Sequence, residues 1–201
     1  QASRSAALAG GLALDKKAGG LLSAALAARG GSKGIPGKNL KVVGGLPLIA
    51  HSIRQALASA LVDAVYVSTD DPEIARVSRQ YGARVIDRPA RIAGDTASSE
   101  SALIHALEEV EKTGPVELVV FLQCTSPIRE AGDIDGAVAT LRDEGADSLL
   151  SVSPSHRFLW KRGEDGPVAL NYDPASRPRR QDLEPQFVEN GSIYDFKPWV
   201  L

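Results

Sequence analysis

Short apolar segments alternate with amphipathic segments along this chain from residue 22 to residue 153. The apolar segments are rich in β-branched residues, and the segments between them repeat apolar residues at the spacing of a helix face. Such alternation is typical of right-handed βαβ units. We therefore predict an α/β fold, a Rossmann-like, open and mostly parallel sheet with helices on both faces. The predicted strands are residues 22–28, 61–68, 84–86, 116–122 and 148–152.

The composition predicts three parts of the chain. Residues 1–20 are rich in Ala and Gly, and we expect a loosely ordered leader. Residues 21–153 form the predicted α/β domain. Residues 154–201 contain more aromatic residues and prolines and a return strand near 187–196. This last lobe is too small for a core of its own, so we expect it to pack on the sheet or on a second subunit.

The charge balance argues against several classes of partner. The formal net charge is -2, so the chain lacks the basic field that binds nucleic acid or anionic membranes. No segment approaches the roughly 20 apolar residues that span a bilayer. Cys124 is the single cysteine, which excludes an intramolecular disulfide and favours a reducing compartment. We predict a soluble, cytoplasmic protein in which Cys124 is a small buried residue rather than a nucleophile.

A glycine-rich, cationic loop, residues 29–39, follows the first predicted strand. It holds four glycines and three cations in eleven residues. Glycines let main-chain N–H groups approach an anion and adopt positive φ, while Arg29, Lys33 and Lys38 neutralise charge. The register matches neither a Walker A loop nor G-x-G-x-x-G. Because ligands of open α/β sheets lie beyond the carboxyl ends of the strands, this loop predicts a phosphate site there.

Other polar residues near the predicted strand ends have simpler alternatives. Asp70 is explained by helix capping and Asp95 by a turn. Gln123 offers an amide donor and acceptor to a polar substrate, although an ordinary hydrogen bond at the strand end is nearly as good an interpretation. The arginine cluster at 177–181 favours an oxyanion ligand over a solvated surface or a basic address signal.

Seven segments of this chain resemble the acylneuraminate cytidylyltransferases, or CMP-sialic acid synthetases. The resemblance implies the nucleotidyltransferase type of α/β fold and transfer of CMP from CTP to the anomeric hydroxyl of a sialic acid, with Mg²⁺ and release of pyrophosphate. Alternatives are the same transfer to Kdn, legionaminic or pseudaminic acid, or a catalytically inactive nucleotide-binding homologue. The similar segments are residues 27–39, 67–70, 88–90, 95–99, 122–127, 177–182 and 189–194.

The resemblance also implies roles for individual residues and for the subunits. It implies a homodimer built through the late lobe, and a metal-binding acidic pair expected beyond Leu201, so that the chain is expected to continue. Its catalytic residues would be Arg29, Lys33 and Lys38. Its nucleotide-binding residues would be Arg29, Gly30, Gly31, Ser32, Lys33, Asn39, Arg88, Ala97 and Ser99. Its sugar-acid-binding residues would be Gln123, Arg179 and Tyr194.

Overall fold

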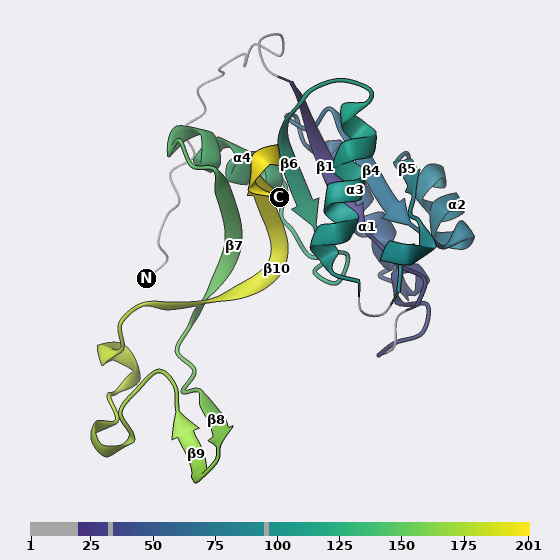
Figure 1. Ribbon diagram of the computed structural model, residues 1–201. Helices are drawn as coiled ribbons and strands as arrows, with labels where there is room; N and C mark the ends of the chain where they lie inside the picture. The colour runs from purple at the N-terminus through teal and green to yellow at the C-terminus, as the bar shows by residue number, and fades with distance from the viewer. Residues whose placement is uncertain (1–19, 32–33, 95–96) are drawn as a thin grey trace.

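A six-stranded sheet confirms the predicted fold class (Figure 1). The computed structural model describes residues 20–31, 34–94 and 97–201, so the predicted leader lies almost wholly outside the described residues. The strand order is β5-β4-β1-β6-β10-β7. The four strands from β5 to β6 are parallel, and β10 runs antiparallel between β6 and β7. The strands are β1 (Leu21–Ala27), β4 (Ala64–Thr69), β5 (Arg84–Asp87), β6 (Val116–Leu122), β7 (Ser148–Ser155) and β10 (Gln186–Phe196).

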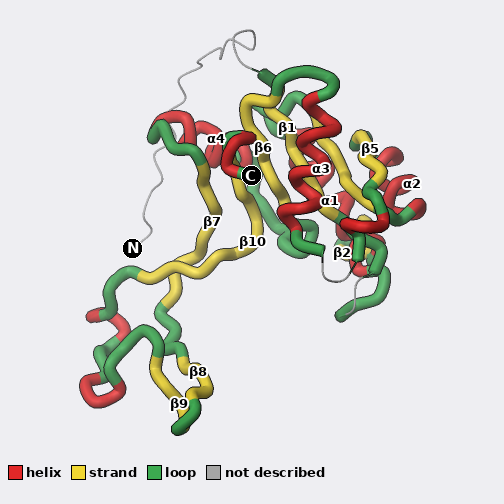
Figure 2. The backbone as a smooth tube through the Cα atoms, viewed as in Figure 1, coloured by secondary structure: helices red, strands yellow, loops and turns green. Residues whose placement is uncertain are grey.

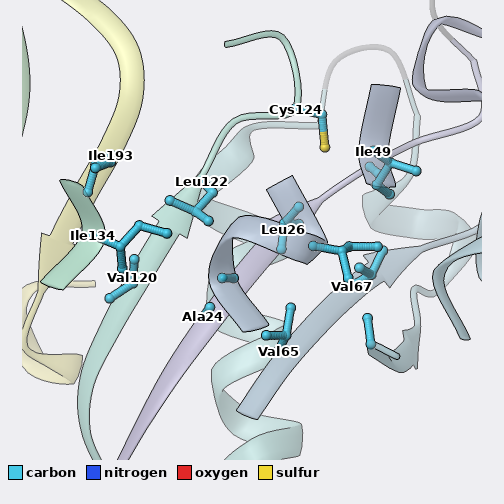
Figure 3. Packing of buried hydrophobic residues seen from close by; sticks show 14 of the residues in the cluster. Ala24, Leu26, Ile49, Val65, Val67, Val120, Leu122, Cys124, Ile134 and Ile193 are labelled. Carbon is cyan, nitrogen blue, oxygen red and sulfur yellow. The ribbon is translucent and has the colours of Figure 1, made fainter. Parts of the chain in front are cut away.

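Helices cover both faces of the sheet. Helices α1 (Leu48–Ala58), α2 (Pro72–Gln80) and α4 (Asp133–Asp143) bury apolar residues in one core cluster, and α3 (Ser99–Glu111) in a second. Successive side chains of a strand point to opposite faces, so Leu26 packs in the first cluster and Ala25 in the second. Figure 3 shows strand residues of the first cluster packed with helix residues Ile49 and Ile134.

No helix among the described residues is long and apolar enough to cross a membrane.

The shorter elements lie in the connections. The short strands are β2 (Val42–Val43), β3 (Leu46–Pro47), β8 (Trp160–Gly163) and β9 (Gly166–Ala169). The 3-10 helices are η1 (Lys38–Leu40), η2 (Ala90–Ile92), η3 (Pro174–Ser176), η4 (Arg180–Asp182) and η5 (Pro198–Val200).

The outer halves of β7 and β10 carry an arm, residues 152–189, away from the sheet (Figures 1 and 2). The arm contains the hairpin of β8 and β9 and the two short helices η3 and η4. Its Tyr172 ring contacts the rings of Phe158 and Trp160, with centroids 4.5 and 5.7 Å apart. Several large apolar side chains of the arm are exposed to solvent, namely Val152, Leu159, Trp160, Val168, Leu170, Phe187 and Val188.

The start of helix α2 corrects the interpretation of Asp70. The capping residue is Asp71, whose Oδ1 accepts hydrogen bonds from the amides of Glu73 (2.8 Å) and Ile74 (3.0 Å), with Pro72 at the first helical position. Asp70 is therefore available for a contact outside the helix. At the start of α4, Gly132 holds the N-cap position and Asp133 is the first helical residue.

Removing the α2 cap should destabilise the fold moderately. We expect Asp71→Ala to lower the free energy of unfolding by about 1 kcal/mol, because two amides at the helix start lose their acceptor. Urea denaturation at pH 7 measures this difference. Glu73→Gln, which weakens an exposed ion pair with Arg76 one turn away, is the control and should leave the free energy of unfolding close to that of wild type. Equal effects of both substitutions would contradict the capping role.

Candidate functional site

The glycine-rich loop lies over the carboxyl ends of the parallel strands (Figure 1). The amide of Ala28 donates to the carbonyl of Ser68 at the end of β4 (3.0 Å). The amide of Gly30 donates to Asp70 Oδ1 (3.3 Å), and Arg29 Nη1 donates to the carbonyl of Gly94 (3.3 Å). The loop is therefore tied to β4 and to the connection that follows β5, at the edge where the sequence predicted a ligand site.

Two of the loop glycines are required for different physical reasons. A Cβ atom on Gly30 would lie 2.4 Å from Asp71 Oδ2, so this position needs glycine for space. Gly37 has φ +62°, the left-handed conformation that glycine adopts without strain. Among the described loop glycines only Gly37 has positive φ, which is fewer than the sequence suggested. Ser32 and Lys33 lie outside the described residues.

Arg88 is buried at the end of β5 and held by one residue of the neighbouring strand. Its Nε donates to Ser68 Oγ (3.1 Å) and its Nη2 to the Ser68 carbonyl (2.6 Å). Burial lowers the pKa of Arg88, and the nearby charge of Asp70 opposes that effect. A guanidinium nevertheless stays charged at neutral pH. The site thus contains a fixed positive charge with only 9% of its surface exposed.

Asn39 and Lys38 occupy the far end of the loop, in η1. Asn39 is buried, and its Nδ2 donates to the carbonyl of Arg29 (3.2 Å), which joins the two ends of the loop. Lys38 is partly exposed beside it. This bond closes the loop on itself and places Lys38, beside Asn39 in η1, near the Arg29 end of the loop.

The N-terminus of α3 adds partial positive charge to this edge. Ser98 is the N-cap, and its Oγ accepts from the amide of Ser101 (3.1 Å). Ser99, the first helical residue, is exposed, and the amide of Ala97 donates to Gly94, whose carbonyl also accepts from Arg29. Unpaired amides at a helix start favour anions. The structure thus brings the described nucleotide-binding candidates to one edge of the sheet.

Gln123 and Tyr194 belong to a neighbouring part of the same edge. Gln123 directly follows β6, and Tyr194 of β10 pairs in register with Phe121. The hydroxyl of Tyr194 donates to Glu189 Oε2 (3.0 Å), and burial together with this bond raises the pKa of Tyr194. The strand pairing therefore brings these two sugar-acid candidates to adjacent strands.

Arg179 is placed apart from them within one chain. It lies in the arm, where its Nε is 2.6 Å from Asp182 Oδ2, and its side chain is 74% exposed. The arm leads away from the sheet along β7 and β10, so Arg179 lies apart from the sugar-acid candidates of the same chain (Figure 1). Arg177 of the same cluster lies over the ring of Phe158, with its Cζ 4.2 Å from the centroid.

Sequence reasoning missed three residues of this edge. Asp70 accepts a hydrogen bond from the Gly30 amide, Ser68 accepts one from Arg88, and Arg129 donates one to the carbonyl of Gln123. The sequence pattern explains Asp70 as a helix cap and Ser68 as an ordinary strand residue. For Arg129 the local sequence carries no signal, because only the structure shows that its guanidinium is partly buried among acceptors.

Cys124 and His51, two further side chains of reactive type, lie in structural surroundings. Cys124 is buried, as the sequence predicted, and burial raises the pKa of its thiol to about 12, so the thiol is neutral. His51 Nε2 lies 2.7 Å from the carbonyl of Val43. Within the described ranges, no group of three or more His, Cys, Asp or Glu side chains could hold a metal. Asp70 and Asp71 each accept amide hydrogen bonds through Oδ1.

A mostly parallel α/β sheet with a cationic, glycine-rich loop over its strand ends is typical of nucleotide-binding proteins. The sequence model of the family described as Cytidylyltransferase matches residues 24–194, and the chain belongs to this family. The resemblance predicted from the sequence is thereby confirmed.

The relatives specify the family further. The chain is 40% identical to N-acylneuraminate cytidylyltransferase A of Danio rerio over 184 residues, which cover 90% of this chain and 42% of the relative. It is 38% identical to N-acylneuraminate cytidylyltransferase of Oncorhynchus mykiss, over 86% of this chain and 40% of the relative. The chain thus spans about two fifths of the length of these relatives.

A solved structure shows the same fold. The structure of CMP:2-keto-3-deoxy-manno-octonic acid synthetase complexed with CTP matches with a TM-score of 0.66 and 24% identity. The match covers 90% of this chain and 75% of that one.

Proposed function

We propose that this chain carries the nucleotide-binding and transfer site of an N-acylneuraminate cytidylyltransferase. It would transfer CMP from CTP to the anomeric hydroxyl of a sialic acid and release pyrophosphate. The observation that supports this most directly is the loop at residues 29–39, bonded to the end of β4 next to the buried Arg88. Relatives that share 38 and 40% of its residues carry that name, which favours a sialic acid over other nine-carbon acids.

The chemistry needs positioning and charge neutralisation more than a protein nucleophile. In phosphoryl transfer the protein aligns the attacking oxygen with the phosphorus and stabilises negative charge on the phosphate oxygens. Arg29 and Lys38, together with Lys33, would hold the triphosphate. Asn39, Arg88 and Ser99 would contact cytosine and ribose.

Gln123 and Tyr194 would orient the sugar acid so that its anomeric oxygen faces the innermost phosphorus. An amide and a phenol hydroxyl supply the neutral donors and acceptors that a polyhydroxylated substrate requires. Magnesium stays a prediction from the resemblance. The resemblance places an acidic pair for the metal beyond Leu201, and side chains and backbone of this chain would bind and orient the two substrates.

We also infer a homodimer formed through the arm. The arm exposes large apolar side chains, including Trp160, Phe187 and Val188, which is typical of a surface that a partner covers. A second copy seated there would let Arg179 reach the sugar-acid site of its partner. The buried single thiol of Cys124 agrees with a cytoplasmic location.

Pyrophosphate release tests the proposed function. We expect release only when CTP, N-acetylneuraminic acid and Mg²⁺ are present together, because the reaction joins both substrates. Kdn, legionaminic and pseudaminic acids should be poorer acceptors in the same assay. Equal turnover with ATP, GTP or UTP would contradict a cytidylyltransferase. Calorimetric binding of CTP without product at any magnesium concentration would identify an inactive homologue instead.

A further inference from the structure

Arg129 fastens the segment after β6, residues 123–129, to helix α1 and to strand β10. Its Nη1 donates to Ser52 Oγ (3.1 Å) and Gln55 Oε1 (2.8 Å) of helix α1. Its Nη2 donates to the carbonyl of Gln123 (3.3 Å) and to the carbonyl of Ser192 in β10 (2.6 Å). One guanidinium therefore fixes the end of β6 against β10 and against α1.

This arrangement depends on the shape of arginine. Arg129 is partly buried, and its Nε is buried without a hydrogen-bond partner among the described residues. Removing a cation from water is costly unless acceptors surround it. The planar fork reaches acceptors on both sides at once, whereas a lysine ammonium is a point charge on a flexible stem. A lysine at this position would keep the charge and lose the double link.

On the β10 side of Arg129, the backbone at Gly191 lies close to the side-chain amide of Gln123. Gly191 has φ +68°, and a Cβ atom there would lie 2.9 Å from Gln123 Oε1. The preceding residue is fixed in turn, because Ser126 Oγ donates to the carbonyl of Asn190 (2.8 Å) and Ser151 Oγ to Asn190 Oδ1 (2.6 Å). The irregular pairing between Glu189 and Tyr194 is therefore an ordered bulge that limits where the Gln123 side chain can lie.

We propose that Arg129 is a positioning residue for the sugar-acid half of the site. By holding the carbonyls of Gln123 and Ser192 together, it sets the Gln123 amide against Gly191 and toward the acceptor. This inference rests on the proposed function, since it assigns Gln123 to the sugar acid. It assigns no contact between Arg129 and either substrate.

Steady-state pyrophosphate release by the full chain, with N-acetylneuraminic acid or CTP varied in turn, tests the proposal. We expect Arg129→Lys and Arg129→Met to lower kcat/KM for the sugar acid about thirtyfold, because misplacing a substrate-orienting group by a fraction of an ångström is that costly. The KM for CTP should stay within about twofold, since the loop at 29–39 is held by other bonds.

A matched control and a double-mutant cycle separate positioning from general stability. Arg142→Lys removes an exposed arginine whose partner is Glu117, and it should change neither KM. In a Gln123→Ala background, Arg129→Lys should lower kcat/KM for the sugar acid by less than about threefold further, because the amide that Arg129 positions is gone. Gly191→Ala keeps Arg129 but crowds the same amide, and we expect the same selective loss. This variant decides the matter should the Arg129 variants fail to fold.

The outcomes distinguish this inference from the proposed function. The positioning role alone would be overturned if the chain turns over CTP and the sugar acid but the losses in kcat/KM from the Arg129 and Gln123 substitutions multiply independently. It would also be overturned if the Arg129 substitutions change the KM for CTP as much as they change the kinetics of the sugar acid. A wild-type chain that requires neither CTP nor the sugar acid would remove the proposed function, and this inference with it.

Discussion

Lys38→Ala is expected to lower kcat/KM for CTP about a thousandfold, a loss of about 4 kcal/mol in transition-state stabilisation. Lys38 lies in η1 next to the buried Asn39, at the end of the loop that is closed onto Arg29. Its ammonium would neutralise charge that grows on the phosphate oxygens as pyrophosphate leaves. Because the closed loop already holds the ammonium in place, it would neutralise this charge without reorganisation. Removing the ammonium should therefore lower the rate strongly.

Lys41→Ala is the matched control, because Lys41 is an exposed lysine at the end of the same short helix. We expect its turnover to stay within about twofold of wild type. Thermal unfolding by circular dichroism should show midpoints close to wild type for both variants. A Lys38→Ala chain that unfolds, yet keeps normal activity per folded molecule, would show that Lys38 is structural.

Asp195→Asn is expected to stabilise the protein by up to about 4 kcal/mol at pH 8. Asp195 lies in β10 with none of its surface exposed, in register with Val120 of β6 and Leu149 of β7. Neither of its carboxylate oxygens has a hydrogen-bond partner among the described residues. Burial raises the pKa of Asp195 from 3.8 to about 7, because an ionised carboxylate in this setting is poorly solvated.

The sign of the pH dependence follows from this raised pKa. Between pH 3.8 and about pH 7 the folded chain keeps a proton on Asp195 that the unfolded chain has released. The contribution of Asp195 to stability is therefore fully present below pH 3.8 and is lost as pH rises toward 7. Asn carries no charge at any pH, so the stability gained by Asp195→Asn should be small at about pH 4, increase through this window and level off above it.

Urea denaturation of wild type and Asp195→Asn at intervals from about pH 4 to about pH 8 measures this difference. Asp165→Asn, which removes the same charge from an exposed turn of the arm, is the control and should give a flat difference near zero. A stability gain for Asp195→Asn that does not change with pH would contradict an ionisable buried carboxyl.

Local patterns predicted much of this molecule. The strands at 116–122 and 64–69 and the start of α2 follow from runs of apolar residues and from turn chemistry within a few positions. The loop at 29–39 was placed at the ligand edge from one further rule, that parallel strands present their carboxyl ends together. The prediction erred by one residue at the α2 cap, because Asp70 and Asp71 are chemically equivalent in the sequence and differ only in which amides they face.

The sequence by itself determined the α/β class, the position of the cationic loop, and the buried state of Cys124, because each depends on residues close together in the chain. Only the tertiary structure decided that β10 enters between β6 and β7, that Arg179 is carried out on the arm, and that Arg129 reaches acceptors 63 and 77 residues away. Those outcomes depend on which distant backbone groups meet when the strands pair. No local spacing encodes that choice, because the same apolar strand satisfies its hydrogen bonds with more than one neighbour.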